Sequence, residues 1–244
     1  VRADDAYVQG TQTLNVGITG TSGGGYEALT TTSTATTTVT DDADATMVTI
    51  STTTATVTEG GSIVYTATTS NPVTGSALVV TLSNGQTITI PVGQSSANSA
   101  PFAVRADDAY AQGTQTLNVT AAGTTGGNFE AVTRSGTATT TVTDDADATT
   151  VTITASTANV AEGGSITYTA SVNNAVTGTP LAITLSNGQT ITIPVGQSSA
   201  TSAVFAVRAD DAYVQGMQTL NVGIASTSGG SYEALTTTST TSTS

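Results

Sequence analysis

Apolar and polar residues alternate along most of the chain, and no segment shows the period of an amphipathic helix. Between residues 45 and 147, seven short stretches place Val, Ile, Leu or an aromatic residue at every second position, with Thr and Ser in between. Strands with one buried and one solvent-exposed face have this pattern. The sequence therefore predicts an all-β fold in which threonine faces solvent.

The seven predicted strands are short and are separated by turn signals. Asn84-Gly85 is a strong signal for a two-residue hairpin, and Ile88, Ile90 and Val92 after it are expected to point inward. Tyr110 is a candidate for the tyrosine corner of immunoglobulin-like domains. The strands are predicted at residues 47–58, 62–69, 77–83, 86–92, 97–104, 115–121 and 136–143. Seven such strands in about 100 residues are typical of an immunoglobulin-like Greek-key β-sandwich.

The chain is built from repeats. The sequence VRADDAY begins at Val1, Val104 and Val207, which are 103 residues apart, and TVTDDADAT, EGGSI and SNGQTITIPVGQSSA recur at the same spacing. A period of domain size indicates an array of domains, since solenoid repeats are shorter. The predicted domains are the C-terminal part of a repeat at 1–44, a complete repeat at 45–147, and a repeat truncated near its last strand at 148–244. We expect these tandem domains to form an extended rod.

Charge and residue usage exclude several functions. The chain carries 17 acidic residues against 4 basic ones, for a net charge of −13, so we expect no nucleic-acid partner. It contains no apolar stretch of 18 residues, so we expect no membrane insertion of these residues. His and Cys are absent and every basic residue is Arg, which removes the usual imidazole base, thiol nucleophile and Schiff-base amine. We therefore predict that the chain is not an enzyme.

All acidic residues fall in four recurring places. If successive strands alternate in direction, the turn after the first strand, the loop after the fifth and the linker after the seventh lie at the same end of a repeat. In the complete repeat, the acidic residues expected to meet there are Glu59, Asp107, Asp108, Asp144, Asp145 and Asp147. Their counterparts in the incomplete repeats are Asp4, Asp5, Asp41, Asp42, Asp44, Glu162, Asp210 and Asp211. The fourth place is the loop after the sixth strand, where Glu130 is expected to approach the linker of residues 41–44.

Carboxylates crowded at one end of a repeat repel one another unless a cation lies among them. Hard oxygen ligands without His or Cys favour Ca²⁺ over zinc or copper, so we predict calcium ligation by these fourteen residues. The alternative is that Asp and Gly merely favour turns and keep the surface soluble. That alternative explains acidic loops, but it does not explain why exposed strand faces carry almost no acid. Arg2, Arg105 and Arg208 are expected to form salt bridges with the neighbouring Asp residues.

The sequence VTEGGSIVYTATTSNPVTGSALVVTLSNGQTITIPVG, followed by VRADDAY and TVTDDADAT, resembles the tandem immunoglobulin-like repeats of giant bacterial surface adhesins. These are the LapA-type biofilm adhesins and similar RTX adhesins. The resemblance implies calcium-stiffened extender repeats on the bacterial cell surface, exported by type I secretion, which hold a ligand-binding tip away from the cell. It also implies that Glu59, Asp144, Asp145 and Asp147 are calcium ligands. Glycine-rich RTX nonapeptides, a tip domain and a retention module do not occur in this sequence.

Three functions stay open at this point. In the first, the chain is an extracellular extender whose partners are the neighbouring repeats of the same chain, and it supports cell adhesion and biofilm formation. In the second, copies of the chain partner one another by strand exchange and form a matrix filament. In the third, the glycine-rich loops after the sixth strand of each repeat contact a ligand.

Overall fold

The computed structural model describes residues 2–244, and Val1, the first residue of the leading partial repeat, lies outside the described residues. The described residues form strands, turns and loops, and none of them lies in a helix that is long and apolar enough to cross a membrane. They divide into two compact units. Of the described residues, the first unit contains 2–57, 62–104 and 116–141, and the second contains 58–61, 105–115 and 142–244. The turn with Glu59, the loop with Asp107 and the linker of residues 144–147 therefore belong to the second unit, although the core of the complete repeat belongs to the first.

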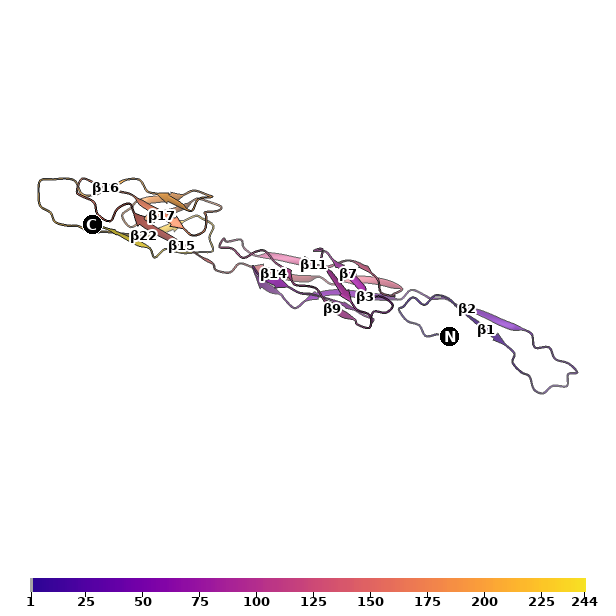
Figure 1. Ribbon diagram of the computed structural model, residues 1–244. Helices are drawn as coiled ribbons and strands as arrows, with labels where there is room; N and C mark the ends of the chain where they lie inside the picture. Colours follow the sequence, from indigo (N-terminus) through magenta and orange to yellow (C-terminus); the bar gives the residue numbers. More distant parts are fainter. Residues whose placement is uncertain (1) are drawn as a thin grey trace. The chain divides into compact units, whose positions relative to one another are not determined.

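The first unit begins with an antiparallel hairpin (Figure 1). Its strands are β1 (Gln12–Gly17) and β2 (Thr34–Val39), paired so that Gln12 lies opposite Val39. Nearly all side chains of these two strands are exposed, and four of the six residues of β2 are Thr.

Residues 45–143 form a β-sandwich of immunoglobulin type, as the alternating pattern predicts. One layer has the strand order β13-β3-β6-β9, in which β3 spans Ala45–Thr52, β6 Tyr65–Thr69, β9 Ser96–Asn98 and β13 Ala131–Ser135. The other strands form the orders β12-β7-β8 and β11-β14-β4, with β4 Thr56–Thr58, β7 Leu78–Leu82, β8 Thr87–Ile90, β11 Gln115–Val119, β12 Ala121–Thr125 and β14 Ala138–Thr143. A short pair joins β5 (Ser62–Ile63) to β10 (Phe102–Ala103).

One predicted strand is divided between the layers, and one predicted loop forms a strand. The strand predicted at 47–58 is β3 followed by β4, which pair in different sheets, and β13 occupies a segment that was predicted as loop before the last strand. Strand β13 runs parallel to β3, and the chain then turns at Gly136 to enter β14. Gly136 has φ +80°, and a Cβ there would lie 2.7 Å from the carbonyl oxygen of Ile50. Period-two patterning does not signal such a switch, because both halves remain alternating strands.

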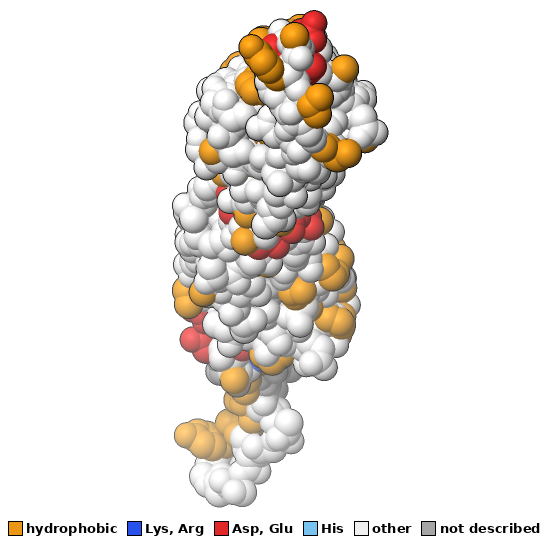
Figure 2. All heavy atoms as spheres, turned by 90° about the vertical axis from the view of Figure 1, so that its left-hand side faces the viewer, with side chains coloured by type: hydrophobic (Ala, Val, Ile, Leu, Met, Phe, Trp, Pro, Cys, Tyr) orange, Lys and Arg blue, Asp and Glu red, His pale blue; other side chains and the backbone are white. Residues whose placement is uncertain are grey.

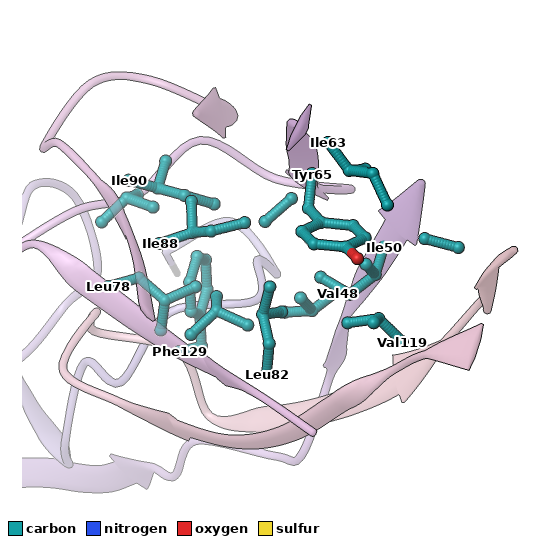
Figure 3. Close-up of a cluster of buried hydrophobic side chains, with 14 residues drawn as sticks. Val48, Ile50, Ile63, Tyr65, Leu78, Leu82, Ile88, Ile90, Val119 and Phe129 are labelled. Atoms are coloured by element: carbon teal, nitrogen blue, oxygen red, sulfur yellow. The ribbon is translucent and has the colours of Figure 1, made fainter. Parts of the chain in front are cut away.

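The core of this sandwich lies between its layers (Figure 3). Inward-facing side chains of β6 and β7 meet there, and the ring of Tyr65 packs near Ile50 and Ile63. The buried cluster contains Val48, Ile50, Ile63, Tyr65, Ala67, Val73, Leu78, Val80, Leu82, Ile88, Ile90, Val119, Phe129 and Ala138. Most of these positions follow directly from the period of two.

The prediction that Val92 points inward was wrong. Strand β8 ends at Ile90, the next residues turn through Gly93 at φ +84°, and Val92 is 54% exposed. The expectation that threonine faces solvent also has exceptions. Thr46 and Thr140 are both buried. Thr46 Oγ1 accepts a hydrogen bond from the side-chain amide of Asn71 at 3.0 Å, and Thr140 Oγ1 donates one to the Thr54 carbonyl at 2.6 Å. Their burial is tolerated because each hydroxyl has a partner.

The second unit contains a second sandwich (Figure 1), whose first layer has the same strand order as that of the first sandwich. One layer is β20-β17-β15-β23, with β15 Ala148–Ala155, β17 Tyr168–Val172, β20 Ser199–Thr201 and β23 Ala234–Thr236. The other layer has the order β19-β18-β22-β24, with β18 Leu181–Leu185, β19 Thr190–Ile193, β22 Leu220–Ser228 and β24 Thr240–Thr243. A separate short pair joins β16 (Ser165–Ile166) to β21 (Phe205–Ala206). It buries its own core around Tyr168, Ile183 and Ile193.

The end of β8 provides a matched test of this core. Ile90→Ala should destabilise the sandwich by about 2–5 kcal/mol, because a fully buried side chain is replaced by a cavity. Val92→Ala, two residues further on, should change stability by less than about 0.5 kcal/mol, because Val92 is exposed. Equilibrium urea unfolding of both variants measures the difference, and equal destabilisation by the two substitutions would contradict this assignment of the core.

Candidate metal centre

Three acidic segments of the complete repeat meet in the second unit. Glu59 lies in the turn between β4 and β5, Asp107 lies between β10 and β11, and Asp144, Asp145 and Asp147 follow β14. Two backbone hydrogen bonds tie these segments together. The Glu59 amide donates to the Thr143 carbonyl at 3.0 Å, and the Gly60 amide donates to the Arg105 carbonyl at 2.8 Å. The meeting of turn, loop and linker was predicted from strand direction, because it follows from the antiparallel alternation of strands.

Gly60 allows the turn to approach Asp107 closely. Its φ is +71°, and a Cβ at this position would lie 2.9 Å from the Cβ of Asp107. A larger residue would be strained in its backbone and would push Asp107 away. The glycine of the EGGSI sequence therefore has a role in building the site.

Carboxylate oxygens gather closely in this region. Three overlapping groups have ligand atoms within 4.8 Å of one another: Glu59, Asp144 and Glu233; Glu59, Asp107 and Asp145; and Asp145, Asp147 and Glu233. Together they contain six residues, which we call the carboxylate cluster. Figure 2 shows that acidic side chains on the displayed face are confined to a few patches, with uncharged surface between them.

Glu59 is the buried member of the carboxylate cluster. The residue is 4% exposed, and its Oε2 accepts a hydrogen bond from Arg105 Nε at 2.8 Å. Its other oxygen, Oε1, is buried and has no hydrogen-bond partner. A buried carboxylate oxygen without a partner is costly, so Oε1 has free capacity for a ligand.

Arg105 neutralises one side of the cluster. Besides Glu59, its guanidinium contacts Asp144 Oδ1 and donates to the Gly113 carbonyl at 2.8 Å. The salt bridge predicted to the neighbouring Asp residues is therefore made instead to residues far away in sequence, because the backbone bonds above bring the Glu59 turn and the linker to Arg105. The corresponding pairs are Arg2 with Asp41 at 2.6 Å and Arg208 with Glu162 at 3.3 Å.

The electrostatic environment differs between the two sides. Burial raises the pKa of Glu59, and the hydrogen bond from Arg105 only partly offsets this effect. The negative charge of Asp147, burial and the charge of Asp145 raise the pKa of Asp107. The pKa of Asp144 is lowered, because N–H groups of Gly113 and Gln112 and the Arg105 charge outweigh its burial. The surroundings therefore favour the ionised form of Asp144 and disfavour the ionised forms of Glu59 and Asp107.

Glu233 was missing from the predicted ligands. It lies just before β23, its Oε2 accepts a hydrogen bond from the Asp147 amide at 2.6 Å, and its Oε1 is buried without a partner. A signal for it existed, since Glu130 was expected to approach the linker of residues 41–44. The Asp44 amide indeed donates to Glu130 Oε2 at 2.6 Å. The same reasoning one repeat later identifies Glu233.

The second Asp of each VRADDAY sequence has a different role. Asp108 lies outside the carboxylate groups; its Oδ1 accepts a hydrogen bond from the Tyr110 amide at 2.8 Å, and its Oδ2 contacts the Gln112 side chain. Asp5 and Asp211 make the same bonds to the amides of Tyr7 and Tyr213, at 2.9 Å and 2.7 Å. These aspartates shape the loop in the manner of an Asx turn.

The incomplete repeats hold smaller groups. In the first unit, Asp4, Asp42 and Asp44 form one group within 4.8 Å, and the charges of Asp42 and Asp44 raise the pKa of Asp4. Asp41 stands apart, because it pairs with Arg2 and accepts a hydrogen bond from the Gln9 amide, which lowers its pKa. Among the described residues, Glu162 and Asp210 belong to no group of three acids.

The family model of the LapA domain matches residues 44–145 and 147–244. The chain belongs to the LapA domain family. The two LapA domains follow each other directly, and the sequence between β14 and β15, which carries Asp144, Asp145 and Asp147, lies where the first match ends and the second begins. The carboxylate cluster thus combines residues of both domains.

Comparison with individual proteins adds little. No curated protein matches the sequence. Among solved structures, the chain is similar to FdeC, described as a broadly conserved adhesin of Escherichia coli. The sequence identity is 16%, the alignment covers 86% of this chain and 68% of FdeC, and the TM-score is 0.28. Similarity at that level supports no argument about fold or function, so the family assignment rests on the LapA match.

The raised pKa values predict a pH dependence in the absence of divalent cations. Folded Glu59, Asp107 and Asp4 have higher pKa values than their ordinary 4.5 and 3.8, so the folded chain retains protons that the unfolded chain has released. Their stabilising contribution is present below these ordinary values and is lost as pH rises through the folded pKa values. The lowered pKa of Asp144 acts below 3.8, outside this range.

We therefore expect the thermal midpoint in chelator to fall as pH rises from about 4.5 to 7. Differential scanning calorimetry over this range measures the slope, and Asp107→Asn should reduce it. A midpoint that is constant or rises with pH would contradict the proposed repulsion.

Proposed function

We propose that this chain is an extender segment of a bacterial cell-surface adhesin and that calcium bound by the carboxylate cluster stiffens it. Membership of the LapA domain family and the tandem arrangement of near-identical sandwiches support a structural, adhesive role. In that role the repeats hold the adhesin's binding tip away from the cell during attachment and biofilm formation. The single observation that carries the calcium part is the buried, unpartnered Oε1 of Glu59 within the cluster.

The donor set of the cluster suits calcium. Every candidate ligand is a carboxylate oxygen, and Ca²⁺ takes six to eight oxygens from such residues, carbonyls and water. Six carboxylates and the Arg105 guanidinium carry a formal charge of −5, which a single divalent cation does not neutralise. Glu59, Asp145 and Glu233 each belong to two groups, and carboxylates shared in this way are suited to bridge two ions. We therefore propose more than one Ca²⁺ in the cluster.

Bound calcium would stiffen the chain by fastening the linker at both ends. The short linker after β14 has no strand structure of its own, and without a cation it is held by the contacts of Asp144 with Arg105 and of the Asp147 amide with Glu233. Ions held by Asp145 and Asp147 would tie it to Glu59 and Asp107 on one side and to Glu233 on the other. Extracellular modules of this kind bind Ca²⁺ at about 10⁻⁴–10⁻³ M. At the low calcium of the cytosol the carboxylates would repel, which suits export of an unfolded chain.

The repeated VRADDAY sequence provides a matched pair of variants for calcium binding. Asp107→Asn removes a ligand of the cluster and should weaken calcium binding, whereas Asp210→Asn changes the same motif position outside any carboxylate group and should not. For the unmutated chain, calcium at about ten times its dissociation constant should stabilise the fold by about 1.4 kcal/mol for each ion bound. Isothermal titration calorimetry and thermal unfolding measure both effects. Equal calcium affinity in the two variants would rule out this ligand set.

The extender role predicts a change in flexibility. Small-angle scattering of the 244-residue chain should show a narrower distribution of end-to-end distances with calcium than in chelator. Light scattering serves as the control, since the mass should stay that of a monomer in both conditions. Identical scattering curves would contradict stiffening, and a mass that rises with concentration would favour the filament alternative.

A further inference from the structure

The tyrosine of the VRADDAY sequence makes a contact that the carboxylate cluster does not explain. The ring of Tyr110 stacks on Tyr232, with centroids 5.5 Å apart and an angle of 26° between the planes. The Tyr110 hydroxyl donates a hydrogen bond to the Ala175 carbonyl at 2.6 Å. Two backbone bonds flank the rings, from the Ala111 amide to the Ser231 carbonyl at 3.0 Å and from the Glu233 amide to the Ala109 carbonyl at 3.2 Å. We call this set of contacts the aromatic dock. The tyrosine-corner prediction for Tyr110 was therefore wrong, because the hydroxyl bonds to the following repeat.

The same dock occurs in the first unit. Tyr7 stacks on Phe129 with centroids 5.6 Å apart and the same angle of 26°, and its hydroxyl donates to the Pro72 carbonyl at 2.7 Å. The Val8 amide donates to the Asn128 carbonyl, and the Glu130 amide donates to the Ala6 carbonyl. Because Phe replaces Tyr at the second ring, the dock requires an aromatic face there but no hydroxyl.

The third copy of VRADDAY shows which parts exist without a partner. Tyr213 is 77% exposed, yet its amide still bonds to Asp211 as in the docked copies. The Asp-built loop thus forms on its own and presents the tyrosine. Docking depends on a suitable loop opposite it.

The receiving loop has a recognisable sequence, Gly-Gly-x-aromatic-Glu. In one loop, Gly229 has φ +82° and its Cβ would lie 2.2 Å from the Pro180 carbonyl oxygen, while a Cβ on Gly230 would lie 2.8 Å from the Tyr232 ring. Gly126 and Gly127 are restricted in the same way in the other. The glycines therefore let the loop fold tightly behind the ring, so that the ring faces the docking tyrosine.

The dock and the carboxylate cluster share residues of the same loops. Glu233 directly follows Tyr232, and its own amide is part of the dock. Asp107 precedes Tyr110 by three residues in the opposing loop. Stacking of the two rings therefore brings Glu233 to the linker, where it accepts the hydrogen bond from the Asp147 amide.

We propose that Tyr110 is a positioning residue that recognises the Gly-Gly-x-aromatic-Glu loop of a following repeat without any cation, and that this dock holds Glu233 in place for cation binding. Tyr7 has the same role toward Glu130. The first part concerns the aromatic contact alone, and the second rests on the proposed calcium function. The aromatic contact would thus form between repeats of this type without calcium, and calcium bound at the linker would then stabilise the same arrangement.

The test compares Tyr110→Ala with Tyr213→Ala, which removes the same residue from the same motif where it is exposed. In chelator, hydrogen exchange of the Ala111 and Glu233 amides should be slow in the unmutated chain and in Tyr213→Ala, and faster in Tyr110→Ala. Tyr232→Phe should behave like the unmutated chain, because Phe129 occupies the equivalent position. Unchanged exchange in Tyr110→Ala would overturn recognition by this residue.

Calcium titration of the same variants tests the second part. Tyr110→Ala should weaken calcium binding about 3- to 10-fold, Tyr110→Phe should restore most of the affinity, and Tyr213→Ala should have no effect. Faster exchange with unchanged calcium affinity would overturn the positioning role while leaving the dock intact. If the unmutated chain binds no calcium, the proposed function fails, but the exchange result still decides whether the dock forms. Circular dichroism confirms that each variant retains its sandwiches.

Discussion

Mutual repulsion among the six carboxylates of one cluster is the constraint on which the other features of this protein depend. Among the described residues, Arg105 is the one basic residue with ion pairs to this cluster, and it engages Glu59 and Asp144 while the other carboxylates remain close to one another. The raised pKa values of Glu59 and Asp107 are the direct consequence of this crowding and burial. The proposed binding of a divalent cation would relieve this repulsion, because its positive charge would lie among the carboxylates.

The β-sandwich provides rigid ends that concentrate this charge. Its strand faces carry Thr and Ser, so the surface between the ends is nearly free of charge, while the acids are restricted to turns and linkers. Backbone bonds from Glu59 to Thr143 and from Gly60 to Arg105 fix the turns relative to one another. Because well-packed cores hold the strands, small loops can be held in a strained, like-charged arrangement without unfolding the repeat.

The carboxylate cluster is completed by the repeat that follows it. Glu233 and Tyr232 come from the loop before β23, whereas Glu59, Asp107 and Tyr110 come from the preceding repeat. A site divided in this way couples nearest neighbours only, so stiffness would accumulate repeat by repeat along a tandem array. The near-identity of the repeats then has a physical reason, since every repeat must both present a tyrosine and receive one.

The sequence by itself determined the features that depend on local patterns. The period of 103 residues separates the repeats, the alternation of apolar residues identifies Leu78, Val80, Leu82 and their neighbours as core, and antiparallel strand direction brings the acidic turns together. These follow because side chains alternate across a strand and because consecutive strands reverse direction.

Only the tertiary structure decided which acids form the cluster and what surrounds them. Asp107 and Asp108 are adjacent and chemically identical, yet one joins the carboxylates and the other shapes the loop for Tyr110. Arg105 pairs with Glu59 and Asp144, 46 and 39 residues away, and Glu233 reaches Asp147 across 86 residues. Such partners depend on how loops from different strands fold toward one another in space, and spacing along the chain carries no direct record of that approach.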